Sequence, residues 1–92
     1  MYEIKNYTRQ KAKSLNVMVK PSKNKNKKID VFNSKGKKLA SVGAIGYKDY
    51  PTYIQLKGKK FADERRRLYK IRHQSDRKLK GSAGYYADKL LW

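Results

Sequence analysis

The sequence predicts an α+β fold, a small single domain in which a lysine-rich β-hairpin packs with three to four short helices. Three observations lead to this prediction. The chain has 92 residues, which is enough for one modest hydrophobic core. Apolar and polar side chains alternate on both sides of the turn sequence "NSKGK". Elsewhere, apolar side chains recur at helical spacing, and glycine or proline separates the segments.

Residues 1–26 are expected to form a helix followed by a basic arm. Thr8 is the expected N-cap of this helix, and Asn16 suits its C-terminus. Residues 17–19, "VMV", then lead out as extended chain. Residues 20–28 alternate lysine with polar residues and contain no aliphatic side chain. They are interpreted either as a solvated linker or as an arm that contacts phosphates.

Residues 27–92 are expected to form a compact hairpin-plus-helices domain. The hairpin covers about residues 29–42, with Asn33 and Gly36 able to take positive φ in its turn. Two strands alone are not stable, so the hairpin must pack on helices or gain a third strand, for which residues 17–19 are available. Gly43 and Gly46 indicate a tight exit from the sheet.

Two helices are expected after that exit. Asp49 is placed to cap the first, with Pro51 in its first turn, and Gly58 ends it. The main helix is expected over residues 59–74. Helical spacing puts its core-facing side chains on one side, flanked by two further residues. This predicted apolar face consists of Phe61, Leu68 and Ile71, flanked by Ala62 and Tyr69.

Arg65 and Arg72 interrupt that apolar face, because they are seven residues apart and fall in its middle. A charge at such a place must be paired or must reach out along its aliphatic stem. One interpretation is a structural ion pair with Asp49, Asp76 or Asp88. The other is a phosphate clamp at the edge of the core, which uses the forked geometry of guanidinium.

The chain ends on an apolar stretch, "YYADKLLW", which predicts a last helix over about residues 83–92 with Ser82 as its N-cap. Its apolar face, expected to close the core against the main helix and the hairpin, consists of Tyr86, Ala87, Leu90 and Leu91. Tyr85 and Trp92 fall together on the other side. They are candidates for packing on another segment or for docking a partner chain.

The charge balance points to a polyanionic partner. Twenty-five Lys and Arg face seven Asp and Glu, which gives a net charge of +18. Such self-repulsion destabilises a compact state unless a polyanion screens it, and nucleic acid is the leading candidate. No apolar run is long enough to span a membrane, and no membrane partner is expected. The expected phosphate contacts are Lys23, Lys25, Lys27, Lys28, Lys35, Lys37, Lys38, Arg66, Arg67 and Lys70.

Catalysis is not expected. The chain lacks cysteine and has a single histidine, His73, so disulfides and cysteine zinc sites are excluded and no metal or cofactor is predicted. Metal-dependent nucleases need converging carboxylates, whereas the acids here are few and scattered. The tyrosines around Lys48 (Tyr47, Tyr50 and Tyr53) are interpreted either as core and rim aromatics or as platforms on which bases stack.

Three motifs carry a family resemblance. The segment "GYKDY" includes Gly46, Tyr47, Asp49 and Tyr50, and the helix "RRRLYKIRH" includes Arg65, Arg66, Tyr69, Arg72 and His73. The terminal "GSAGYYADKLLW" includes Gly81, Gly84, Tyr85, Tyr86, Ala87, Leu90, Leu91 and Trp92. Over about residues 27–92 the chain resembles a family of small basic proteins encoded by large DNA viruses, including giant viruses of protists. The resemblance implies a viral origin and a place in the virion or the infected host cell, but no catalytic residue.

The leading functional prediction is a viral, non-enzymatic DNA-binding protein that contacts the phosphate backbone and acts in genome condensation or packaging. One alternative is a minor capsid or internal cementing protein, which would use the same charge against acidic capsid proteins. A second is an RNA-binding or translation-linked factor, although DNA is favoured over RNA. The oligomeric state does not follow from the sequence.

Overall fold

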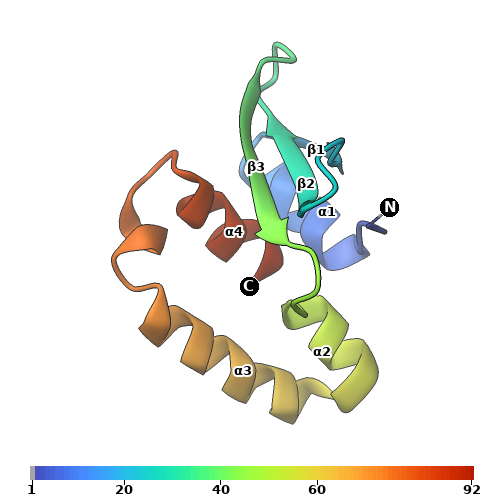
Figure 1. Cartoon of the computed structure of the whole chain (residues 1–92), viewed down its shortest axis with the longest axis vertical. Coiled ribbons are helices and arrows are strands. Elements are labelled where there is room, and N and C mark those ends of the chain that lie inside the picture. The colour runs from blue at the N-terminus through green and yellow to red at the C-terminus, as the bar shows by residue number, and fades with distance from the viewer. Residues whose placement is uncertain (1) are drawn as a thin grey trace.

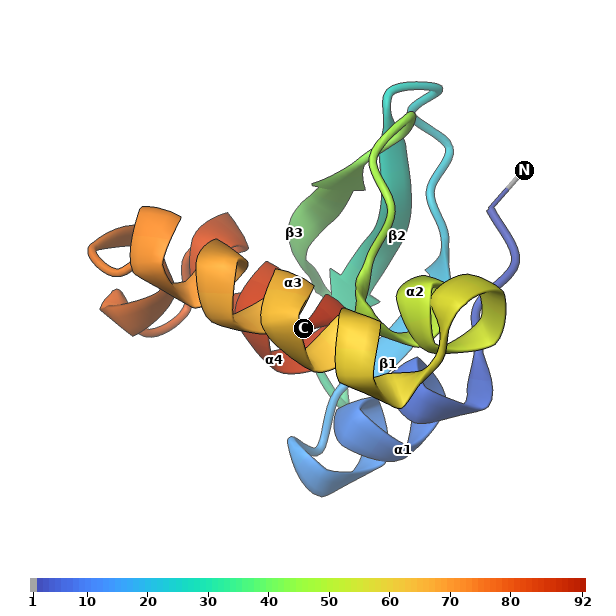
Figure 2. The same ribbon diagram turned by 90° about the horizontal axis from the view of Figure 1, so that it is seen from below.

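A computed structural model describes residues 2–92 and confirms the α+β class. Figure 1 shows the sheet above the α2–α3 helix pair, with α4 returning to lie beside the sheet. Figure 2 shows the same elements from below, with α3 crossing in front of α4. In chain order the elements are α1 (Asn6–Ser14), β1 (Met18–Pro21), β2 (Lys27–Phe32), β3 (Lys38–Ala44), α2 (Tyr50–Lys57), α3 (Lys59–Arg72), the 3-10 turn η1 (Asp76–Lys78) and α4 (Ala83–Leu91).

The three strands form one antiparallel sheet in the order β1-β2-β3. Val19 of β1 pairs with Val31, and Ile29 pairs with Val42 of β3. The segment after α1 is therefore the third strand that a two-stranded hairpin needs. β1 and β2 take up the two ends of the expected arm over residues 20–28, so the loop between these strands is only residues 22–26.

The hydrophobic core lies between the inner face of the sheet, α1 and α4. The two leucines at the end of α4, Leu90 and Leu91, are fully buried, which confirms that the last helix closes the core against the hairpin. Its helical partner in the core is α1, so the predicted packing against the main helix is wrong. Ser82 caps α4 by accepting a hydrogen bond from the backbone N–H of Tyr85, as predicted. The buried apolar cluster consists of Ile4, Ala12, Ile29, Val31, Val42, Leu90 and Leu91.

The predicted N-cap of α1 is wrong. The helix begins at Asn6, with Lys5 at the N-cap position, and Thr8 lies inside it. The Thr8 hydroxyl is buried and donates a hydrogen bond of 2.8 Å to the backbone oxygen of Leu90. This residue therefore joins α1 to α4, a role that local sequence does not indicate.

The predicted apolar face of α3 is also wrong. Phe61 and Ile71 are 45% and 57% exposed, whereas Ala62 and Tyr69 are buried. The helix packs through aromatic rings on α2 and the end of α4, not through aliphatic side chains on the sheet. Its contact face is consequently rotated relative to the one that hydropathy alone predicts.

Glycines take positive φ at two places where the sequence predicted a tight exit or a turn, namely the exit from the sheet after β3 and the turn between β2 and β3. Gly43 has φ +83° and lies so close to α4 that an added Cβ would stand 2.7 Å from a methyl carbon of Leu91. In the β2–β3 turn, Gly36 takes positive φ. Asn33 does not, because its side-chain oxygen instead accepts hydrogen bonds from the backbone N–H groups of Lys35 and Lys37.

Candidate nucleic-acid interface

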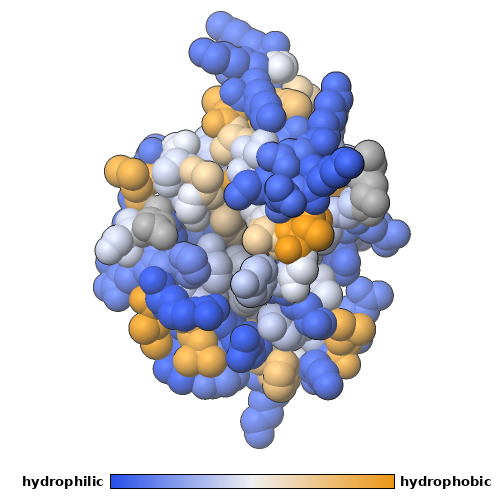
Figure 3. Space-filling view, in the orientation of Figure 1, coloured by the Kyte–Doolittle hydropathy of each residue, from blue (hydrophilic) through white to orange (hydrophobic). Residues whose placement is uncertain are grey.

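The exposed lysines of the sheet occupy its two opposite ends. Since β2 is antiparallel to both neighbours, the turns before and after it point in opposite directions. Lys23 and Lys25 are exposed in the first turn, and Lys35 and Lys37 in the second. Figure 3 shows hydrophilic side chains crowded over the hairpin tip at the top of the molecule. These lysines do not form one patch.

Lys28 is removed from the predicted set of phosphate contacts. It is only 6% exposed, and its Nζ lies 3.0 Å from Oδ2 of Asp49, which is 1% exposed. The same ammonium group stands over the ring of Tyr2, 5.4 Å from the ring centroid. A lysine that neutralises a buried carboxylate cannot also reach a phosphate, so this prediction is corrected.

Asp49 is the centre of a buried polar cluster. Its Oδ2 also accepts a hydrogen bond of 2.6 Å from the hydroxyl of Tyr2, and its Oδ1 accepts from the backbone N–H and hydroxyl of Thr52. Burial opposes the charged form, but the hydrogen bonds from Thr52 and Tyr2 and the charge of Lys28 outweigh it, and the pKa of Asp49 lies below its ordinary value. The predicted helix cap is confirmed, and it also joins the N-terminus and β2 to α2.

The sheet carries a second buried carboxylate, Asp30, on the face opposite Ile29 and Val31. The hydroxyls of Ser22 and Ser41 donate to it at 2.7 and 2.6 Å, and Nζ of Lys38 lies 3.7 Å away. Burial opposes ionisation, yet the serine hydrogen bonds and the lysine charge keep the pKa of Asp30 below its usual range. Lys38 remains half-exposed, so it stays accessible to a phosphate.

The three basic residues predicted on the outer face of α3 all have intramolecular partners. Lys70 reaches across to α4, where its Nζ lies 2.6 Å from the buried carboxylate of Asp88. Arg66 stands over the ring of Tyr50, 4.0 Å from the centroid. Arg67 makes two hydrogen bonds with Glu64, and both side chains are exposed. The Arg67 pair is readily exchanged for a phosphate, because exposed ion pairs are weak.

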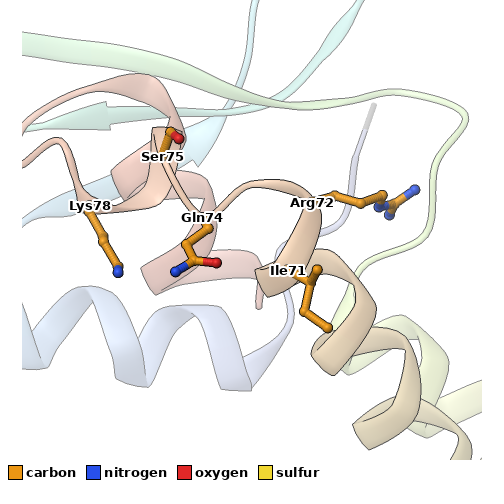
Figure 4. A pocket seen from close by; sticks show the side chains of 5 residues that line it. All are labelled: Ile71, Arg72, Gln74, Ser75 and Lys78. Atoms are coloured by element: carbon orange, nitrogen blue, oxygen red, sulfur yellow. The ribbon is translucent and has the colours of Figure 1, made fainter.

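Arg65 and Arg72 do not form the expected ion pairs with Asp49 or Asp88, whose partners are the lysines described above. The side chain of Asp76 lies outside the described part of the structure. Arg65 instead stands over the ring of Tyr53, 5.5 Å from the centroid. Arg72 is exposed at the end of α3, and Figure 4 shows it extending away from Gln74 and Lys78.

Both arginines line a cleft of about 500 Å³ that is bounded by β2, β3, the loop after β3, α2, α3 and α4. We call it the aromatic cleft. The centre of the molecular face drawn in Figure 3 is hollowed and pale, between the sheet above and the helices below. Among the residues that the structure describes, no aspartate or glutamate lines it. The aromatic and basic side chains that line it are Lys27, Lys28, Tyr47, Lys48, Tyr53, Arg65, Tyr69, Arg72, His73 and Trp92.

Trp92 is held at the cleft wall by stacking. Its ring lies parallel to that of Tyr69, with centroids 4.3 Å apart and an angle of 7° between the planes. Tyr69 also stacks with His73 at 4.4 Å, and Tyr53 approaches Trp92 at 6.2 Å. Tyr85 is edge-on to Tyr86 at 5.3 Å, so it has a different ring partner from Trp92. The expectation that Tyr85 and Trp92 fall together stays a prediction.

Among the side chains that the structure describes, no group of three or more His, Cys, Asp or Glu is arranged to hold a metal ion. Over the same part of the chain, no helix is both long enough and apolar enough to cross a membrane.

Comparisons with known proteins give no relative: the chain matches no family model, no curated protein and no solved structure. The resemblance to proteins of large DNA viruses consequently stays a prediction. What the chain does must be argued from its own residues.

The sequence indicated some members of the aromatic cleft but not the cleft itself. Tyr47, Tyr53 and Lys48 stood out as interleaved aromatic and basic residues, and Arg65 with Arg72 as displaced charges. Lys27 and Trp92 join them only because β2 and the end of α4 meet beside α3. No local pattern links these segments, so their assembly was not predictable from spacing.

Proposed function

We propose that this chain is a non-enzymatic DNA-binding protein that neutralises backbone phosphates and acts in genome condensation or packaging. The observation that carries the proposal is the surplus of positive charge in the folded chain. Ion pairs among the described residues engage only six of the 25 lysines and arginines. The other basic side chains form no ion pair with a carboxylate that the structure describes, which favours a polyanionic partner.

The position of the sheet lysines favours condensation over a single docking site. The turns that carry Lys23 with Lys25 and Lys35 with Lys37 lie at opposite ends of the sheet, in a molecule 37 Å long. Phosphate contacts at both ends allow one molecule to touch two DNA segments at once. Contacts of this kind position a protein on the backbone without reading sequence.

Gel-shift titrations over a salt series test the proposal. The logarithm of the binding constant should fall linearly with the logarithm of salt concentration, with a slope of about −0.9 for each phosphate neutralised. Lys35→Ala with Lys37→Ala should reduce the magnitude of that slope by about 1 to 2. Lys57→Ala with Lys60→Ala removes the same charge from the α2–α3 junction and should leave the slope nearly unchanged. Absence of binding at about 50 mM salt, or binding without a salt slope, would overturn the proposal.

The proposed place of action is the virion, and this part rests on the sequence resemblance alone. If it is right, the protein should leave gently opened particles together with the DNA. Retention in the shell would instead favour the capsid or cementing role. Competition between duplex DNA and RNA of equal length separates the DNA-binding role from a translation-linked one.

A further inference from the structure

We propose that the aromatic cleft binds an unpaired nucleotide of a DNA strand, with its base stacked on Tyr47 and its phosphate held by Lys48 and Arg72. This inference rests on the proposed function, since it takes the ligand to be DNA. It adds a specific site to a surface that otherwise contacts phosphates without preference.

The charge of the cleft selects an anion. Lys27, Lys48, Arg65 and Arg72 all line it, and none of the four forms an ion pair with a carboxylate among the residues that the structure describes. Lys28, in contrast, pairs with the described carboxylate of Asp49. Positive side chains that surround a concave site concentrate their field inside it and raise the local concentration of anions. A phosphate in the cleft would meet cations from β2, the loop after β3, and α3.

The aromatic side chains favour a ligand that carries a planar ring as well as a negative charge. Tyr47 is 76% exposed at the cleft, and it makes no ring contact among the aromatic pairs of residues 2–92. Its faces are therefore open to a ligand. Nucleobases stack on such rings in single-strand-binding proteins, whereas an acidic peptide has no comparable flat group.

The size of the cleft favours an unpaired base. A volume of about 500 Å³ lies in the range of small-molecule sites. Small residues form part of the wall, so side chains do not fill the opening: Gly43, Ala44, Ala83 and Gly84. In a duplex the bases are stacked and paired inside the helix, and a base reaches a protein pocket only when it is unpaired.

The walls of the cleft are preorganised. Trp92 is fixed by its stack on Tyr69 and by a hydrogen bond of 3.1 Å from the hydroxyl of Tyr7 to its backbone oxygen. The stem of Lys28 is fixed by Asp49 at the opposite wall. A site that is already ordered loses less conformational entropy on binding than one that must form around the ligand.

The test uses the fluorescence of Trp92, which is the only tryptophan in the chain and lines the cleft. The full chain is titrated with hexathymidylate and with a blunt-ended duplex DNA hairpin whose loop is closed by a non-nucleotide linker. Hexathymidylate should quench the fluorescence saturably, and the duplex should bind in a gel shift with much weaker quenching. Tyr47→Ala should weaken hexathymidylate binding about 5- to 150-fold, the range for the loss of one base–aromatic stack. Tyr47→Phe keeps the ring and should restore affinity.

Two control variants separate the cleft from the rest of the basic surface. Tyr85→Ala removes a tyrosine that does not line the cleft, and it should leave hexathymidylate affinity unchanged. Arg72→Ala should weaken that affinity, whereas Lys60→Ala, an equal loss of charge elsewhere on α3, should not. None of the four positions belongs to the hydrophobic core, so all variants should fold.

The outcomes distinguish this inference from the proposed function. If duplex DNA shifts normally but Tyr47→Ala binds hexathymidylate like the unmodified chain, the nucleotide site is refuted and general phosphate binding stands. If neither DNA binds, both proposals fail. Equal quenching by hexaglutamate would show charge recognition without base stacking and would also overturn the site. Hexauridylate that binds as well as hexathymidylate would support a nucleotide site that ignores the ribose hydroxyl.

Discussion

The buried ion pair of Lys28 with Asp49 makes a quantitative prediction about stability. At 3.0 Å and an effective dielectric constant of about 20, two unit charges attract by about 5 kcal/mol. That attraction is offset by a desolvation cost of several kcal/mol for each ion. The intact pair therefore adds little net stability, but removing one partner strands a buried charge and should cost about 3–5 kcal/mol.

The two single variants should differ in a way that the hydrogen bonds explain. Lys28→Met leaves the carboxylate of Asp49 with donors from Tyr2 and Thr52, and the loss should lie near 3 kcal/mol. Asp49→Asn leaves the Lys28 ammonium buried without a carboxylate, and the loss should lie near 5 kcal/mol. The double variant should lose less than the sum of the two, by at least about 1 kcal/mol.

Urea unfolding followed by circular dichroism measures these losses. The chain is expected to have a total stability of about 5–14 kcal/mol, so Lys28→Met should remain folded. Its urea midpoint should fall by roughly 1 to 2 M for a slope near 2 kcal/mol per molar urea. Lys59 with Asp63 is the matched control, because that pair has the same 3.0 Å separation but its side chains are 72% and 43% exposed. Lys59→Met should leave the midpoint almost unchanged. Equal, small effects of Lys28→Met and Lys59→Met would refute the argument from burial.

Three further predictions concern the rest of the fold. Thr8→Val should cost about 1–3 kcal/mol in urea unfolding, because the backbone oxygen of Leu90 loses its buried donor, whereas Thr8→Ser should cost less. Deleting residues 90–92 should abolish the cooperative thermal transition in circular dichroism, since loss of each buried leucine side chain costs about 2–5 kcal/mol; an unchanged melt would contradict the core-closing role. The stability that the Asp30 and Asp49 carboxylates contribute should be fully present above the unfolded carboxyl pKa of 3.8 and should be lost on acidification, as their lowered pKa values are crossed. Asp30→Asn should make the free energy of unfolding depend less on pH in the acid range. An unchanged pH dependence would show that the Asp30 carboxylate does not cause the loss of stability.

Local features of the fold were predictable because neighbours in sequence carry them. Ser82 and Asp49 cap their helices as expected, since a cap needs only a side-chain oxygen and the backbone N–H groups a few residues on. Gly43 and Gly46 take positive φ at the exit from the sheet for an equally local reason. The predicted apolar face of α3 was wrong, because this helix packs against aromatic rings from other segments. Phe61 remains exposed there.

The type of partner was predictable from the sequence, but the individual residues of the candidate interface were not. Net charge and the lysine-rich turns follow from composition, and they alone indicate a polyanionic partner. Whether a given lysine is available depends on what the fold brings to it. Lys28 meets an aspartate 21 residues away, and Lys70 meets one 18 residues away, whereas Lys35 meets none among the described residues.

The sequence by itself determined the class of fold, the caps and turns, the apolar helix at the C-terminus and the surplus of positive charge. All of these depend on composition or on residues within a few positions of one another. The tertiary structure alone decided that Trp92 stacks on Tyr69, that Lys28 pairs with Asp49, and that Arg72 and Tyr47 line the same cleft. These outcomes depend on contacts between segments distant in the chain. Such contacts form only when packing places one element against another.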